Sequence, residues 1–227
     1  MIKHEIYSHY PERRINVTKY VAVFSMATLI FIIGIIFGQA LISSKQSTIV
    51  STQKEISLEL ADLELQTEFI QRSPCNATTA LNNLGEKIDK LGTKIIFLEN
   101  QIGKNDPTIL ELKKPYTLLM IRHYMLSEII NAQCGTNNTL IIFVYSNKQE
   151  YISDSEKQGY VIDYVKKKFL NTKLINVYSI AADIELEMTQ TLLQFYNVNK
   201  IPSLIINEKL YSGFQDKDTL EGILESI

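Results

Sequence analysis

The sequence predicts a membrane-anchored α/β protein: an N-terminal transmembrane helix, a helical stalk and an antiparallel helical hairpin, followed by a βαβαββα domain. Three observations lead to this prediction. Residues 21–42 carry no charge, apolar residues from Leu81 to Ile102 recur at spacings of three and four, and β-rich runs alternate with helical stretches from Thr139 onward. The expected boundaries are 1–20 for a tail, 21–42 for the transmembrane helix, 43–72 for the stalk, 73–134 for the hairpin and 135–227 for the α/β domain.

Residues 21–42 are expected to form the transmembrane helix. At about 1.5 Å per residue this helix would be roughly 33 Å long, enough to cross a ~30 Å hydrocarbon core. The positive charge bias before it predicts a single-pass signal-anchor protein of the cell membrane, with its tail in the cytoplasm and the rest outside. The tail carries Lys3, Arg13, Arg14 and Lys19 against Glu5 and Glu12, whereas residues 43–61 contain only two cations, Lys45 and Lys54.

A cleaved signal peptide is the alternative, because Gly38-Gln39-Ala40 has the small-x-small form of a cleavage site. The leader and the apolar run before that site are both long for a signal peptide, which favours a retained anchor. Gly34 and Gly38 also form a G-x-x-x-G spacing, through which two membrane helices can pair, although glycine is common in membrane helices.

The region after the anchor is expected to form three helices. Residues 43–72 contain neither proline nor glycine, which predicts a stalk helix that Ser73-Pro74 ends. Apolar residues recur every seven positions along this stalk at Ile49, Ile56, Leu63 and Ile70.

A second helix carries a seam of alternating three- and four-residue spacing, which is typical of a coiled coil. Its members are Leu81, Leu84, Ile88, Leu91, Ile95, Leu98 and Ile102. A third helix is expected over about 108–133, with a disturbance at Pro115. Because the two helices are similar in length and a short turn at 103–107 joins them, they should form an antiparallel hairpin.

The two cysteines are expected to form a disulfide. Cys75 precedes the second helix and Cys134 follows the third, so closure of the hairpin would bring the two thiols together. An extracytoplasmic location would let the bond persist. The alternative is two unrelated free thiols. Two N-x-[ST] triplets, at Asn76 and Asn137, are weak candidates for glycosylation on the same side.

The C-terminal region alternates between strand and helix patterns. Strands are expected at 139–145, 173–179, 203–207 and 210–213, and helices at 154–170, 184–196 and 216–227. The strand-helix-strand order predicts a parallel pair with a right-handed crossover, and the last two strands should form a hairpin.

This order, together with the run Ile201-Pro202-Ser203-Leu204, resembles the thioredoxin-like fold superfamily. In that superfamily a cis-proline precedes the third core strand within an apolar-Pro-[Ser/Thr]-apolar run, and a glycine follows the final hairpin. Pro202 matches the cis-proline, Ser203 the hydroxyl residue and Gly213 the glycine. The resemblance covers residues 139–227 and implies a cis Ile201–Pro202 bond.

The sequence departs from the redox members of the superfamily, which carry C-x-x-C directly after the first core strand. Residues 146–155 contain no cysteine, so this segment provides no reactive thiolate. A serine of this segment could act as a nucleophile only beside a base, and the three histidines, His4, His9 and His123, lie outside the domain in the sequence. We therefore expect no catalytic residue, no metal site and no cofactor.

The resemblance implies one remaining use of the fold, because the backbone beside a cis-proline can pair with an extended peptide. The surface expected to bind such a peptide combines the loop after the first strand with the proline run: Asn147, Lys148, Tyr151, Ile201, Pro202 and Ser203.

These patterns favour a redox-inactive protein- or peptide-binding or scaffolding module, with the lipid bilayer and an extracytoplasmic protein or peptide as partners. A net charge of -2 gives no reason to expect nucleic acid as a partner. Two alternatives remain. One is a divergent thiol-disulfide oxidoreductase that uses Cys75 and Cys134, and the other is a membrane protein that forms a homo-oligomer through the coiled-coil seam.

Overall fold

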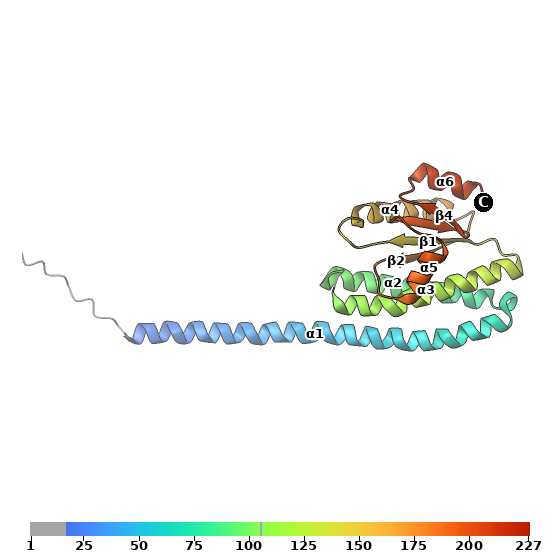
Figure 1. The fold of residues 1–227 in the computed structure, drawn as a ribbon. Helices are drawn as coiled ribbons and strands as arrows, with labels where there is room; N and C mark the ends of the chain where they lie inside the picture. Colours follow the sequence, from blue (N-terminus) through green and yellow to red (C-terminus); the bar gives the residue numbers. More distant parts are fainter. Residues whose placement is uncertain (1–16, 105) are drawn as a thin grey trace, which may run out of the picture. The chain divides into compact units, whose positions relative to one another are not determined.

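The computed structural model describes residues 17–104 and 106–227 (Figure 1). The chain forms two compact units, of which the first ends at Val50 and the second comprises Ser51–Ile227. The expected boundary between 134 and 135 lies inside the second unit, which holds both the hairpin and the sheet. The predicted tail before Val17, with His4 and His9, lies outside the described residues.

Helix α1 (Val17–Arg72) joins the predicted anchor and stalk into one continuous helix. Its first part, Val17–Phe37, is long and apolar enough to cross a membrane, a property that signal sequences share. The helix ends at Arg72, directly before Ser73-Pro74, as predicted. The stalk residue Ile70 is buried, whereas the side chains of Ile49, Ile56 and Leu63 lie outside the described part of the chain.

Helices α2 (Thr78–Ile102) and α3 (Pro107–Cys134) pack against each other and form the predicted hairpin. The seam of α2 is buried from Leu81 to Leu98. These side chains therefore pack inside the protein, which argues against the seam as a surface for oligomerisation. Asp106 caps α3, because its carboxylate accepts a hydrogen bond from the Thr108 N–H at 2.8 Å.

Pro115 does not disturb α3, contrary to the prediction, and the helix continues through it to Cys134. Proline removes one backbone hydrogen bond and clashes with the preceding turn. Leu112 and Leu119 on either side are both buried. Tertiary packing of the helix outweighs the local preference here.

One buried ion pair joins the two helices of the hairpin. Lys113 of α3 pairs with Glu99 of α2, and their side chains are only 9% and 10% exposed. Removal of one partner from such a pair leaves an uncompensated buried charge, so the pair fixes the alignment of the helices. The exposed pairs Lys94–Glu55 and Lys87–Asp62 join α2 to the end of α1 and contribute little.

The disulfide closes the open end of the hairpin, as predicted. Cys75, in the short 3₁₀ helix η1 (Pro74–Asn76), is bonded to Cys134 across a sequence separation of 59 residues, with a Cα–Cα distance of 5.2 Å. The chain contains two cysteines, so both belong to this one bond.

The C-terminal region forms a mixed sheet with the predicted order of elements. These are β1 (Thr139–Tyr145), α4 (Ile152–Phe169), β2 (Ile175–Ala181), α5 (Glu187–Phe195), β3 (Ser203–Ile206), β4 (Lys209–Ser212) and α6 (Lys217–Glu225). In the described residues the strands lie in the order β2-β1-β3-β4. The β1–β2 pair is parallel, whereas β1–β3 and β3–β4 are antiparallel.

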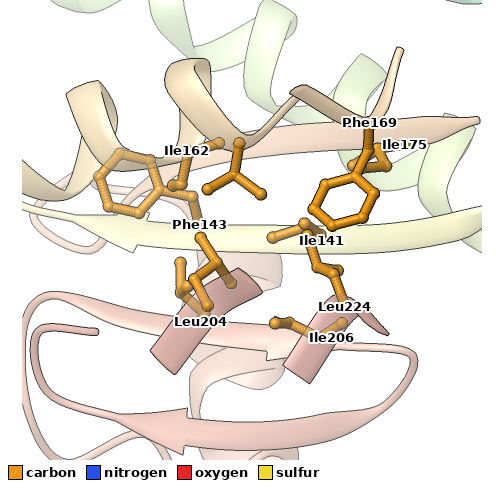
Figure 2. Close-up of a cluster of buried hydrophobic side chains, with 10 residues drawn as sticks. Ile141, Phe143, Ile162, Phe169, Ile175, Leu204, Ile206 and Leu224 are labelled. Atoms are coloured by element: carbon orange, nitrogen blue, oxygen red, sulfur yellow. The ribbon is translucent and has the colours of Figure 1, made fainter. Parts of the chain in front are cut away.

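The sheet is covered on both faces. Ile141 and Phe143 of β1 pack against α4 and α6, where Figure 2 shows Ile162 and Leu224 among the surrounding apolar side chains. On the other face, Tyr178 of β2 packs against rings of α3. Burial on both faces explains why β1 is an almost uninterrupted apolar run rather than an alternating one.

The disulfide should stabilise the second unit. Replacing both cysteines (Cys75→Ser with Cys134→Ser) should lower the free energy of unfolding by roughly 4 kcal/mol, because it opens a loop of this length in the unfolded chain. Urea unfolding of the full-length protein in mild detergent, followed by circular dichroism, measures the change. Reduced wild-type protein should behave like the variant, and equal stability of all three forms would contradict the prediction.

Candidate functional site

The candidate site lies at the carboxyl end of β1, where the loop after this strand and the proline run meet. The antiparallel register pairs Val144 with Ser203. Ile201 and Pro202 therefore lie at the same end of the sheet as the loop that begins at Ser146. The Ile201–Pro202 bond is cis, as predicted.

Two serine hydroxyls hold the loop after β1. Ser155 Oγ, in the first turn of α4, accepts a hydrogen bond from the Ser146 N–H at 3.2 Å, and Ser146 Oγ accepts one from the Lys148 N–H at 3.1 Å. Both serines are buried. The Lys148 carbonyl then accepts the N–H groups of Tyr151 and Ile152. The serines thus fix the loop backbone, which is a structural role.

The structure divides the six predicted peptide-binding residues into two groups. Pro202 and Ser203 are buried, whereas Lys148 is exposed and Asn147, Tyr151 and Ile201 are partly exposed. The side chains of Pro202 and Ser203 are thus not available to a partner, and the prediction that this set binds a peptide stays a prediction for the backbone of this run and for the exposed or partly exposed members. Burial follows from the place of β3, which lies between β1 and β4.

The Ser203 hydroxyl fixes the turn that precedes β3. It donates a hydrogen bond to the Lys200 carbonyl at 2.7 Å and accepts one from the Gly213 N–H at 3.2 Å. Gly213 has φ +82°, a left-handed conformation that glycine adopts without strain. Ser203 and Gly213 together hold the start of β3 against the end of β4.

The backbone of Ile201 is unpaired. No other described residue forms a hydrogen bond with its N–H or its carbonyl. The neighbouring Lys200 and the loop residue Lys148 are exposed, and neither forms an ion pair within the described part of the chain. Within the described part of the chain, this end of the sheet thus offers a backbone donor and acceptor without a partner at Ile201, with exposed Lys200 before it in the chain and exposed Lys148 in the loop after β1.

Sequence reasoning missed a buried polar cluster between the hairpin and the sheet. His123 and Ser127 of α3 meet Tyr178 of β2: His123 Nδ1 lies 2.8 Å from the Tyr178 hydroxyl, and His123 Nε2 lies 3.0 Å from the Leu81 carbonyl. Because a carbonyl only accepts, Nε2 carries the proton and Nδ1 accepts from Tyr178. Ser127 Oγ lies 2.8 Å from the His123 carbonyl and 3.0 Å from the Tyr178 hydroxyl.

His123 therefore contacts the sheet, although it lies outside the C-terminal domain in the sequence. Both of its ring nitrogens already form hydrogen bonds, so His123 joins α2, α3 and β2 and does not serve as a base. The available signal was the spacing of His123 and Ser127, which lie four residues apart and therefore on one face of α3.

A second polar contact joins α3 to Tyr196, the residue that follows α5. The Tyr124 hydroxyl donates to the Glu128 carboxylate and lies 2.9 Å from the Tyr196 hydroxyl. Burial raises the pKa of Glu128 and is also the main reason that the pKa of Tyr124 is raised. The first cluster thus joins α3 to β2 by hydrogen bonds, and the second joins α3 to the residue that follows α5.

Comparisons with known proteins give little further information. No family model matches the chain, and no curated protein matches it. Among solved structures, a chain described as "Structure of a malarial protein" is similar at 15% identity, over 40% of this chain and 97% of that one, with a TM-score of 0.32. A likeness at this TM-score carries no argument about function.

The buried His123 should make the second unit less stable in acid. Burial lowers its pKa in the folded protein, against smaller opposing effects of the Leu81 carbonyl and Asp89, whereas the unfolded chain has a pKa near ~6.5. Between these two values the unfolded state binds more protons, so the free energy of unfolding falls as the pH drops below about 6.5. Above that pH this contribution is constant.

His123→Gln keeps a donor for the Leu81 carbonyl but does not titrate. The variant should lose part of the fall in stability that the wild type shows between about pH 7.5 and about pH 5. Urea unfolding of both full-length proteins in detergent measures the difference. Parallel pH profiles of the two proteins would rule out His123 as a source of the acid sensitivity.

Proposed function

We propose that this protein is a single-pass membrane protein whose extracytoplasmic, redox-inactive thioredoxin-like domain binds a partner protein or peptide. The observation that carries the proposal is the backbone of Ile201, which has no hydrogen-bond partner among the described residues and belongs to a partly exposed residue at this end of the sheet. The strand order β2-β1-β3-β4 and the left-handed Gly213 agree with a thioredoxin-like domain.

Dithiol chemistry at this end of the sheet has no support. Both cysteines belong to the disulfide between η1 and the last residue of α3, which precedes β1 in the chain. Buried serine hydroxyls hold the loop after β1. A partner strand would instead pair with the backbone of Ile201. Lys148 and Lys200 favour an acidic partner, because complementary charge speeds association and excludes cationic competitors.

The apolar segment Val17–Phe37 supports the membrane anchor. The cationic bias of the tail favours a cytoplasmic N-terminus, and an oxidising outer compartment would preserve the disulfide. The anchor would keep the binding domain at the membrane surface, where a scaffold needs it.

The second candidate function is thiol-disulfide exchange at Cys75–Cys134. The exposure of Cys75 favours it, because exchange requires access to a sulfur. We expect the pair to be structural, with a reduction potential below about -300 mV. Equilibration of the full-length protein with glutathione or dithiothreitol buffers, read by thiol alkylation and mass spectrometry, measures this potential. A value near those of the cellular glutathione pool would instead favour exchange.

An acidic extended peptide should bind at Ile201. We expect acetyl-DVEVDV-amide to shift the methyl resonance of Ile201 in full-length protein in nanodiscs, because the peptide backbone pairs beside this side chain. Lys148→Glu with Lys200→Glu should weaken binding about tenfold through charge repulsion.

The matched control is Lys157→Glu with Lys217→Glu, which places the same charge change on α4 and α6. This control should leave the affinity nearly unchanged. Absence of any shift at Ile201 at millimolar peptide, or equal weakening by both double variants, would refute the proposed site.

A further inference from the structure

No strand of the described residues pairs with the outer edge of β2. This strand lies at one edge of the described sheet. The Thr139 N–H donates to the Leu174 carbonyl, and the Ala182 N–H donates to the Tyr145 carbonyl, so the even-numbered positions of β2 bond to β1. Because backbone groups alternate in direction along a strand, those of Ile175, Val177 and Ser179 point away from β1. These outward groups have no hydrogen-bond partner elsewhere in the described residues.

A groove of about 350 Å³ lies along this edge, between β2 and α2. One wall is the β2 segment that includes Val177, with Lys166 of α4 beside it, and the other wall is α2 from Asn82 to Asp89. Gly85 faces the groove: a Cβ added there would lie 3.2 Å from His123 Nε2. The absent side chain at Gly85 therefore leaves α2 close to the sheet without crowding His123.

The α2 wall of the groove is acidic. Glu86 and Asp89 lie three residues apart, so they share one face of the helix. Both are exposed, and neither forms an ion pair in the part of the chain that the structure describes. Tyr178 also lines the groove, and its pKa is raised mainly by burial, with a smaller contribution from the charge of Asp89.

We propose that an extended segment of a partner protein, carrying a lysine or arginine, adds to β2 as a new edge strand. Its backbone pairs with Val177 and Ser179, which are partly exposed, whereas Ile175 is buried, and its cationic side chain faces Glu86 and Asp89. Backbone pairing supplies the affinity and the acidic wall selects the sequence, which is the mode of recognition by strand addition.

This surface is independent of the proposed site at Ile201. The groove borders Leu174 and the amino-terminal half of β2, from Ile175 to Tyr178. The loop at the other site follows Tyr145, which pairs with Ala181 at the opposite end of β2. The two surfaces also differ in charge, so failure of one proposal does not affect the other.

Peptide binding to the full-length protein in nanodiscs tests the inference. The probe is acetyl-TVKVTV-amide, with affinity measured by isothermal titration calorimetry. A peptide with glutamate in place of lysine should bind about tenfold more weakly, because its charge opposes the acidic wall. A peptide with N-methyl groups on alternate amides should lose binding by a similar factor, because it cannot donate to the edge.

Variants of the protein test the charge preference and the backbone pairing separately. Glu86→Gln with Asp89→Asn should abolish the preference for lysine over glutamate, whereas the control Glu150→Gln with Glu225→Gln should keep it. Val177→Pro removes one outward N–H without removing a bond to β1, since an edge strand accepts proline with that geometry. It should weaken the lysine peptide about tenfold while circular dichroism stays unchanged.

Three results would overturn the inference. The first is no heat of binding at millimolar peptide, and the second is equal binding of the N-methylated peptide. The third is a loss of binding in Lys148→Glu with Lys200→Glu but not in Glu86→Gln with Asp89→Asn, which would assign the peptide to the Ile201 site.

Discussion

Strand β1 exposes almost none of its side chains: every residue from Thr139 to Val144 is buried. A strand in this position must be covered on both faces, because each large apolar side chain left in water costs about 1.5–3 kcal/mol. Helices α4 and α6 cover one face (Figure 2). The other face carries Tyr178 and receives α3. The hairpin is therefore part of the core of the second unit, and the sheet and hairpin form one compact body rather than two linked domains.

Polar groups in this contact determine how α3 lies on the sheet. Apolar packing alone tolerates rearrangement, whereas a buried polar group without a partner costs about 1–3 kcal/mol. His123 meets this demand only when the Leu81 carbonyl and the Tyr178 hydroxyl are both in place. Lys113 and Glu99 impose the same requirement between α2 and α3. Because the disulfide fixes the other end of these helices, the hairpin is held at both ends and against the sheet.

The sequence predicted those features that depend on local chemistry. Apolar spacing identified α2, a β-rich apolar run identified β1, Ser73-Pro74 marked the end of α1, and the position of the cysteines indicated their pairing. Features that depend on distant neighbours were missed. The burial of the Pro202 and Ser203 side chains was not anticipated in the expected peptide-binding set, and nothing near His123 in the sequence identifies Tyr178 as its partner. The continuity of α3 through Pro115 is likewise a result of packing on buried neighbours.

An unpaired strand edge exposes a protein to pairing with copies of itself, and soluble proteins reduce that risk by covering or charging the edge. Here α2 lies beside the β2 edge and carries Glu86 and Asp89 along the groove. Two copies that met edge to edge would bring four carboxylates together with two Lys166 side chains, so the contact would keep a net negative charge, which disfavours self-pairing. The same carboxylates attract a cationic strand. The carboxylates thus disfavour pairing with a second copy of this chain and favour pairing with a cationic segment. Both would bond to the same backbone groups of β2, so the charge of the groove decides between them.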